Sequence, residues 1–454
     1  MKTLLRSTLA LGVLLSAAAL AAAQAVPAAA PEANPASPPA ESIITSGRPI
    51  TIQHVRPQDQ RGINMFETSK EPGVEYKGFR VDFGAAFAAQ FQGLRHENAA
   101  EPNVVNGVNA NQLIEIGNGF NNSTANLYLH AQLADGIRVQ LTSYLSSRHH
   151  NETWVKDGFI QMDKSPIPLP PLENLMKFVT LKVGHFEINY GDAHFRRTDN
   201  GNAMYNPFVG NLILDAFTTE VGAEAILRNK GVIAMGSITG GEVRGTVLSP
   251  KQRSASYIGK LGFDRQVKPN LRVRLTGSMY KTNNSASNTL YGGDRAGSRY
   301  YYVVENTAAT ESAQFTSGAI NPSFRNKVTA VQVNPFVKFG GLELFGVIER
   351  AEGRASAEAA NRAIRQYAID TIYRVGPSDE LFIAARYNKV IGQLAGIAGD
   401  VGTNRWQLGA GMFLTPMLMA KIEYVKQQFT GYPVNHVRHG GKFNGIMLEG
   451  VVGF

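Results

Sequence analysis

The chain has 454 residues, with 45 Lys or Arg against 36 Asp or Glu, which gives a formal net charge of +9 at pH 7. Charged residues make up 18% of the sequence, below the roughly 25% usual in soluble globular proteins. The hydrophobic share of 43% excludes disorder over most of the chain, and the absence of cysteine excludes disulfides and thiolate metal sites. Abundant Gly and Tyr favour turns and strands over helices.

Residues 1–23 have the pattern of an export signal peptide. Lys2 and Arg6 form a basic start, residues 9–20 are apolar, and a run of alanines then offers a cleavage site. A transmembrane anchor is the alternative, but the apolar stretch is short and Ala-rich and no basic stop follows it. We therefore expect the mature chain to begin near Gln24. Export makes nucleic acid the least expected partner for the basic surplus.

Two short regions follow the signal. Residues 24–42 are rich in Pro and Ala and have too little bulk to form a core, so they predict an extended linker. Residues 43–77 are polar apart from one possible short strand at 50–55. We expect them to be a periplasmic N-terminal segment, on the periplasmic side of the next domain or within its mouth. That domain is predicted to span residues 78–454.

From Gly78 onward, apolar and polar residues alternate. Between Phe79 and Phe91 every odd position is apolar and every even position is polar or small. Successive side chains of a strand point to opposite faces, so this pattern predicts a strand with one apolar face. The stretch is longer than the about 5–6 residues of an average strand and suits a tilted strand that crosses a bilayer. Similar alternation recurs at 127–143, 271–280 and 405–424.

Two kinds of connection separate these stretches. Short connections are expected at 134–136, 164–176, 228–230, 267–270, 340–341, 376–379 and 415–417. Longer polar loops are expected at 93–124, 148–153, 189–217, 248–254, 282–327, 351–363, 390–404 and 429–441. The pattern predicts an all-β fold, a transmembrane antiparallel β-barrel of sixteen strands with both chain ends at the periplasmic side. Residues 231–247 are interpreted as one bulged strand; a hairpin there would allow eighteen strands.

The last strand alternates up to a terminal aromatic residue, Phe454. This ending resembles the signal by which the barrel assembly machinery recognises bacterial outer-membrane barrels. The segments LKVGHFEINYGDAHFRRTDN (181–200) and GMFLTPMLMAKIEYVKQQ (411–428) are similar to segments of the phosphate-selective porin superfamily. The resemblance covers residues 78–454 in organisation but is local in sequence. It implies a sixteen-stranded, possibly homotrimeric channel in the outer membrane of a Gram-negative-type bacterium, and does not establish phosphate as the solute.

A barrel of this size encloses water, and charged side chains at its narrowest point select solutes. The predicted inward-facing cations are Arg80, Arg138, Lys182, Arg272, Arg274, Lys338, Arg374, Arg386, Arg405 and Lys421. The predicted inward-facing anions are Asp82, Glu343, Glu349, Asp370 and Glu423. The excess of cations favours small anionic solutes. The alternative is that these charges pair across the wall and neutralise one another.

The loop 189–217 is the expected constriction, because in porins of the resembled kind the third loop folds into the lumen. Its apolar residues would pack against the wall, while Arg196 and Arg197 face the solute. Asp192, Asp199 and Asp215 would be opposing charges, and Arg272, Arg274 and Lys421 are the wall candidates for solute contact. An external loop is the alternative.

An enzymatic function has little support in the sequence. The histidine pairs are His149 with His150, His185 with His194, and His436 with His439. None has the HExxH spacing of a zinc site, and His130 near Ser143 is the only faint catalytic candidate. We expect no catalytic residue, no metal and no cofactor. The predicted function is a water-filled diffusion channel, and the alternative is a structural or surface-interaction barrel with an effectively closed lumen.

Overall fold

The computed structural model describes residues 47–148, 153–244, 247, 250–293, 299–312 and 316–454. The predicted export signal and the linker 24–42 lie outside the described residues.

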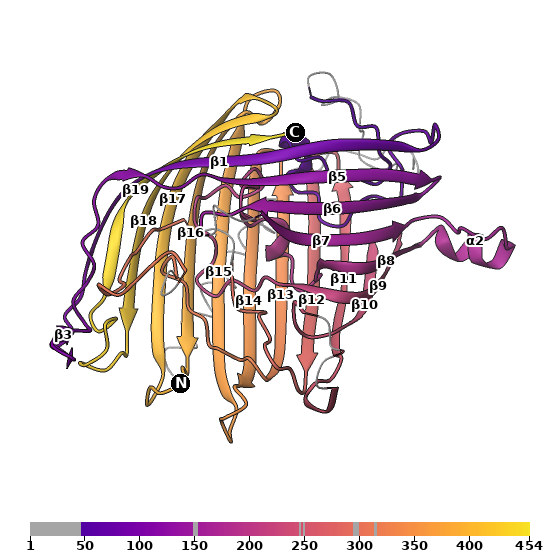
Figure 1. The fold of residues 1–454 in the computed structure, drawn as a ribbon. Helices are drawn as coiled ribbons and strands as arrows, with labels where there is room; N and C mark the ends of the chain where they lie inside the picture. Colours follow the sequence, from indigo (N-terminus) through magenta and orange to yellow (C-terminus); the bar gives the residue numbers. More distant parts are fainter. Residues whose placement is uncertain (1–46, 149–152, 245–246, 248–249, 294–298, 313–315) are drawn as a thin grey trace, which may run out of the picture. The chain divides into compact units, whose positions relative to one another are not determined.

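Sixteen long strands form one antiparallel sheet that closes into a barrel (Figure 1). Closure occurs where β1 (Arg80–Glu97) pairs with both β5 (Thr124–Ala134) and β19 (Lys442–Gly453). The other long strands are β6 (Ile137–Leu145), β7 (Thr153–Met162), β8 (Val179–Glu187), β9 (Thr219–Asn229), β10 (Val232–Thr239), β11 (Ser256–Lys268), β12 (Leu271–Thr282), β13 (Lys327–Phe339), β14 (Leu342–Arg354), β15 (Arg362–Val375), β16 (Leu381–Gly392), β17 (Val401–Thr415) and β18 (Leu418–Thr430).

The remaining elements are short. They are β2 (Val104–Val105), β3 (Val108–Asn109), β4 (Gly119–Phe120), the helix α2 (Pro170–Met176) and the 3₁₀ turns η1 (Gln60–Gly62), η2 (Ala193–Phe195) and η3 (Pro250–Gln252). Within the described ranges, no helix is long and apolar enough to span a membrane. The predicted connection 164–176 contains α2 and joins β7 to β8.

The prediction of sixteen strands is confirmed, whereas the eighteen-strand alternative is wrong. The bulged strand expected over 231–247 is also wrong, because β10 ends at Thr239. Gly241 adopts a positive φ of 73° and its N–H donates to the Glu220 carboxylate at 2.9 Å, so the chain leaves the sheet there. The possible strand at 50–55 does not form either, because the backbone turns at His54, which has a φ of 54°.

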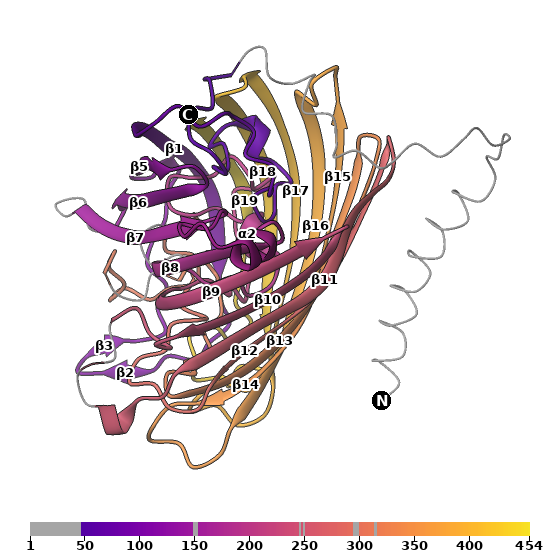
Figure 2. The same ribbon diagram turned by 90° about the vertical axis from the view of Figure 1, so that its right-hand side faces the viewer.

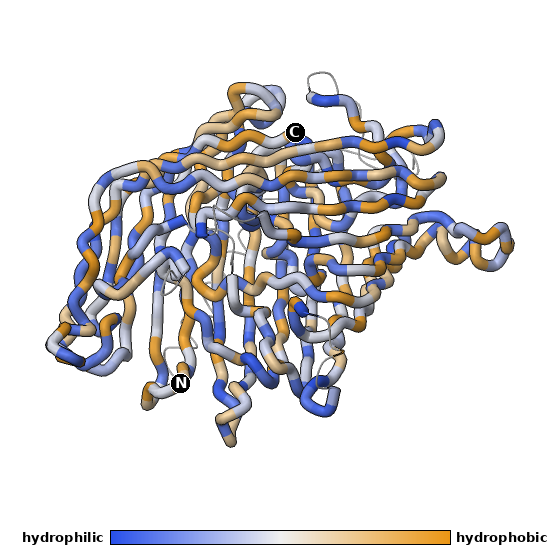
Figure 3. The backbone as a smooth tube through the Cα atoms, in the orientation of Figure 1, coloured by the Kyte–Doolittle hydropathy of each residue, from blue (hydrophilic) through white to orange (hydrophobic). Residues whose placement is uncertain are grey.

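Alternation along the strands separates two faces of the barrel. In β18 every second residue is buried and the intervening residues are exposed. Figure 3 shows hydrophilic and hydrophobic residues alternating along the strands. Many of the exposed residues are apolar, among them Phe83 on β1, Leu408 on β17 and Ile422 on β18. We call the exposed apolar residues of the long strands the outward belt. A surface of this kind is typical of a barrel that meets lipid.

Three segments fill the inside of the barrel. They are the N-terminal segment (residues 47–77), the third loop (residues 189–217) and the described parts of the long loop (residues 283–293, 299–312 and 316–326). Figure 2 shows the N-terminal segment, in indigo, within the ring of strands. Phe208, Val209, Ile213 and Leu214 of the third loop are fully buried.

These segments form hydrophobic clusters with inward-facing wall residues. Ile213 and Leu214 share one cluster with Tyr291 of the long loop and Tyr280 of β12. The hydrophobic core of this barrel therefore lies in its lumen, where burying each large apolar side chain contributes about 1.5–3 kcal/mol.

The chain terminus takes part in closure. Phe454 and Ala85 exchange two backbone hydrogen bonds, of 2.9 and 3.0 Å. The Phe454 side chain is 44% exposed, on the outer side of the barrel wall. Its role as an assembly signal stays a prediction.

The outward belt predicts that the free-energy cost of introducing a charged residue depends on its position along the strand. Leu408 and Leu414 lie on β17 and are each 54% exposed, but Leu408 is central and Leu414 is next to the turn 415–417. If the belt meets lipid, Leu408→Arg costs about 2–4 kcal/mol and Leu414→Arg only about 0–1 kcal/mol. Urea titration of the two variants in lipid vesicles measures both. Equal, small losses would show that the belt faces water.

Candidate functional site

One wall arginine holds two of the internal segments. The Arg274 guanidinium, on β12, donates to both oxygens of Glu67 in the N-terminal segment at 2.7 and 3.0 Å. It also donates to both oxygens of Asp192 in the third loop, at 2.8 Å each. Bidentate arginine–carboxylate contacts are among the strongest charge-assisted hydrogen bonds. Arg274 therefore fastens the N-terminal segment and the third loop at the same point of the wall.

A second cation completes this cluster. The Lys260 ammonium, on β11, lies 3.0 Å from Asp192 and 3.7 Å from Glu67. Burial alone would raise the pKa of Glu67, but Arg274 and Lys260 outweigh it and lower the pKa to about 2. The pKa of Asp192 is likewise held below its ordinary value by Lys260 and Arg274, against burial. Both carboxylates are therefore ionised at neutral pH, and the cluster is close to electrically neutral.

The two adjacent arginines of the third loop have different surroundings. Arg196 lies between the rings of Phe336 and Phe345 and donates to Glu343 at 3.3 Å. Arg197 instead makes a bidentate contact with Asp215, at 2.5 and 2.8 Å. Both arginines are buried, so neither presents an unpaired charge to open solvent.

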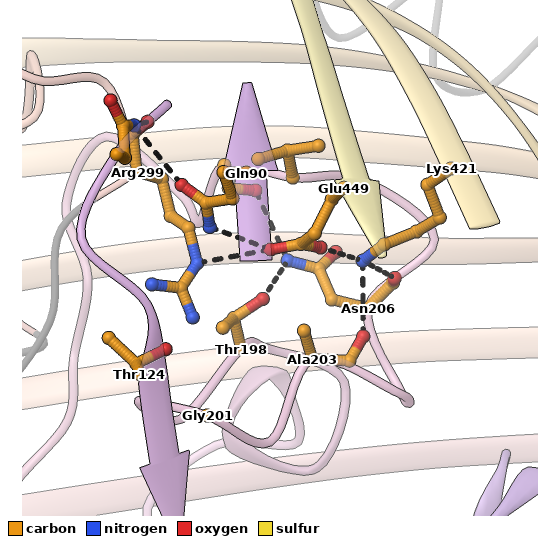
Figure 4. A network of polar contacts seen from close by, with 12 residues as sticks. Gln90, Thr124, Thr198, Gly201, Ala203, Asn206, Arg299, Lys421 and Glu449 are labelled. Atoms are coloured by element: carbon orange, nitrogen blue, oxygen red, sulfur yellow. Dashed lines mark hydrogen bonds and ion pairs between the residues drawn. The ribbon is translucent and has the colours of Figure 1, made fainter. Parts of the chain in front are cut away.

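The opposite wall supports the backbone of the third loop. The Lys421 ammonium donates to the carbonyl oxygens of Ala203, Asn206 and Phe208 at 3.0–3.1 Å and pairs with Glu449 at 2.6 Å (Figure 4). The Glu423 carboxylate accepts from the N–H of Val209 at 2.8 Å. Backbone groups buried away from water need such partners.

A cavity of about 190 Å³ lies against the wall formed by β5 to β9. The third loop and the N-terminal segment form its other side. Its charged lining residues are Arg56, Glu67, Arg138, Lys156, Asp157, Lys182, Glu187, Arg197 and Asp199. Aromatic residues line it as well: Phe66, Tyr128, Phe159, Phe195 and Tyr205.

Most of the charges in this cavity are paired. Lys156 contacts Glu187 at 3.0 Å and also contacts Asp199. Lys182 lies 3.1 Å from Glu224 on the neighbouring strand. Arg138 differs, because it forms no ion pair with a carboxylate within the described part of the chain.

The hydrogen-bond partners of Arg138 are neutral side chains. Its guanidinium donates to Gln161 at 2.7 Å and to Gln140 at 3.3 Å. It also lies 5.8 Å from the centre of the Phe159 ring. The positive charge of Arg138 is thus the least neutralised of the strand cations that line this cavity.

The predicted site residues therefore separate into two groups. Arg197 and Asp199 line the cavity of about 190 Å³, whereas Arg196, Asp192, Arg274 and Lys421 are not among its lining residues. Arg272 on β12 pairs with Asp264 of the neighbouring strand β11 at 2.6 Å.

Sequence reasoning missed several contributors to this cavity. It did not assign Arg56 or Glu67, which precede the first strand, because nothing in their local pattern indicates insertion into a barrel. Lys156 was also missed, because the β6–β7 pairing is irregular between Thr142 and Ser143, which disturbs the alternation there.

The histidines are held by ordinary contacts. His194 contacts Glu187 at 2.9 Å, and His185 contacts Thr219 at 2.9 Å. His130 is buried, whereas Ser143 follows the alternation of the exposed Leu141 and lies on the other face of the wall. No group of three potential His, Asp or Glu metal ligands occurs in the described ranges. His149 and His150 lie outside those ranges.

Comparisons with known proteins give structural neighbours only. No family model and no curated protein matches the sequence. The trimer form of in-vitro folded OmpT, an outer membrane protein of Vibrio cholerae, is 12% identical with a TM-score of 0.50, over 83% of this chain and 100% of that one. An anion-selective porin from Comamonas acidovorans is 11% identical with a TM-score of 0.50, over 83% and 100%. The likeness shows a shared barrel fold.

The Arg274 cluster predicts a large stability difference between two arginine variants. Arg274→Ala leaves two buried carboxylates with fewer partners, which costs about 3–5 kcal/mol. Arg350→Ala removes an exposed pair with Glu352 and costs about 0–1 kcal/mol. Unfolding by urea in vesicles measures both, and adding Glu67→Gln and Asp192→Asn to Arg274→Ala should restore part of the loss. Equal costs for the two arginine variants would mean that the cluster does not anchor the fold.

Proposed function

We propose that this protein is an outer-membrane channel of the porin type, which passes small hydrophilic solutes along the wall formed by β5 to β9. The observation that carries the proposal is a polar, charged cavity of about 190 Å³ inside a closed barrel with an outward apolar belt. The barrel fold that the chain shares with outer-membrane porins agrees with this function.

The dimensions of the passage restrict its solutes. The third loop and the N-terminal segment form one side of the cavity of about 190 Å³, and β5 to β9 form the other, so the proposed passage is narrow. A channel this narrow favours solutes of a few heavy atoms and excludes large ones.

Anions are the preferred solutes under this proposal. Arg138 carries a positive charge without a carboxylate partner, whereas Lys156 and Arg197 are neutralised by theirs. Side chains of one sign on a low-dielectric wall raise the local concentration of the opposite ion. Phosphate, which the family resemblance suggests, belongs to this class and is the first solute to test.

The cellular setting follows from the same proposal. The barrel would lie in outer-membrane lipid of a Gram-negative-type bacterium, assembled by the barrel assembly machinery through the strand that ends at Phe454. A homotrimer is proposed from the resemblance, and the neighbour from Vibrio cholerae is itself described in a trimer form.

A closed, structural barrel is the second candidate. The observation that favours it is the close packing of the third loop against the wall, where a further cavity has a volume of only about 20 Å³. Current through single barrels in planar bilayers separates the two candidates directly. A barrel that folds normally but carries no current would support the closed form.

The anion preference predicts a specific effect of Arg138. Arg138→Gln should move the zero-current potential in a salt gradient toward cations, most strongly at low salt, because screening is weakest there. Arg350→Gln removes the same charge from an exposed position and should leave the potential unchanged. If both variants match the parent at low salt, Arg138 does not set the selectivity.

A further inference from the structure

The N-terminal segment lies along the cavity as part of its lining. From the contacts of residues 47–77 we infer that this segment is a second constriction element, which together with the third loop sets the width and charge of the passage. This inference rests on the channel function proposed above. It goes beyond that function by assigning pore-lining residues to a region that precedes the first strand.

Contacts with three separate parts of the wall hold the segment. Glu67 is bound by Arg274, as described above, and its side chain is almost fully buried. Asn64 donates to the Glu343 carboxylate at 2.6 Å. Lys70 contacts Asp163 at 3.1 Å. Each partner lies near the end of a strand that adjoins a short connection, so the segment is fixed to the wall at that end of the barrel.

The segment also contacts the third loop directly. The Arg56 guanidinium donates to the carbonyl oxygen of Phe195 at 2.9 Å and lies 3.7 Å from the centre of the Tyr205 ring. The Tyr205 hydroxyl donates to the carbonyl oxygen of Pro57 at 2.5 Å. Phe66 meets Phe195 edge-on, with ring centres 5.7 Å apart. The two segments therefore form one continuous inner surface.

Five residues of the segment line the cavity: Arg56, Gln58, Phe66, Glu67 and Thr68. Thr68 faces the wall, because Gln161 on β7 donates to its hydroxyl at 3.3 Å. Gln161 is also the partner of Arg138, so Thr68 lies close to the cation proposed to attract anions. A solute that passes Arg138 must pass Thr68 as well.

The chain contains no cysteine, so a single introduced thiol tests this placement. Thr68→Cys puts a thiol on the lining at little cost in volume. Glu71→Cys puts one on the same segment at an exposed residue outside the lining. Each variant is reconstituted in planar bilayers and treated with a small, negatively charged methanethiosulfonate reagent.

Modification of Thr68→Cys should reduce the single-channel current by about half or more. The attached group narrows the passage and adds a negative charge beside Arg138. A reducing agent should restore the current, and modified Glu71→Cys should conduct as before. The inference is overturned if Thr68→Cys is modified without loss of current, or if mass spectrometry shows that the reagent cannot reach it.

A second pair of variants separates this inference from the channel function. Deletion of 47–77 should raise the conductance of the folded barrel, judged by its heat-modifiable migration. If the parent protein carries no current and the deletion variant conducts, the N-terminal segment closes the passage completely. If neither conducts, both proposals fail.

If the deletion variant does not fold, the same conductance measurement is made on the Glu67→Gln variant. This change weakens the clamp on the segment but keeps the Arg274–Asp192 contact of the third loop, so it should increase the conductance or move the zero-current potential toward anions. Glu71→Gln, with the same loss of charge, should do neither. Equal behaviour of the two glutamine variants would contradict a role for the segment in the passage.

Discussion

The contact of Arg274 with Glu67 and Asp192 is the constraint on which the interior depends. A charge that an inserted segment buries against the barrel wall loses its contact with water, so it needs a partner there. Arg274 provides two bidentate contacts at once, to the N-terminal segment and to the third loop. The positions of both segments are therefore coupled through one side chain of β12.

Backbone groups impose the second condition on a filled lumen. The third loop has almost no regular structure of its own, so wall side chains must satisfy its N–H and C=O groups. Asn388 and Gln366 accept from the N–H groups of Ile213 and Leu214 at 2.7 and 2.9 Å, while Lys421 serves three carbonyl groups. The polar inward face of the strands thus acts as a docking surface for a loop, and the residues so engaged are not available to a solute.

Strand number and register could be predicted from the sequence because both follow from a local period of two. β12 ends at Thr282 and β13 begins at Lys327, at the ends of the loop predicted for 282–327. The loop interiors could not be predicted in the same way, because their partners are distant in sequence. Arg196 and Arg197 are adjacent, yet one pairs with Glu343 and the other with Asp215.

The net charge of the passage cannot be obtained by counting the charged residues of the barrel wall. The wall cations predicted to face inward outnumber the wall anions, but Glu67 and Asp192 come from segments that a strand register does not include. Arg374 pairs with Glu343 at 2.8 Å, and Arg386 pairs with Asp370 at 2.6 Å, in each case on a neighbouring strand. Selectivity then depends on the remainder after pairing, which among the strand residues lining the cavity of about 190 Å³ includes Arg138 and also Asp157 on β7. A preference for anions consequently requires that the Arg138 guanidinium outweigh the Asp157 carboxylate, and that the inserted segments direct every solute past both.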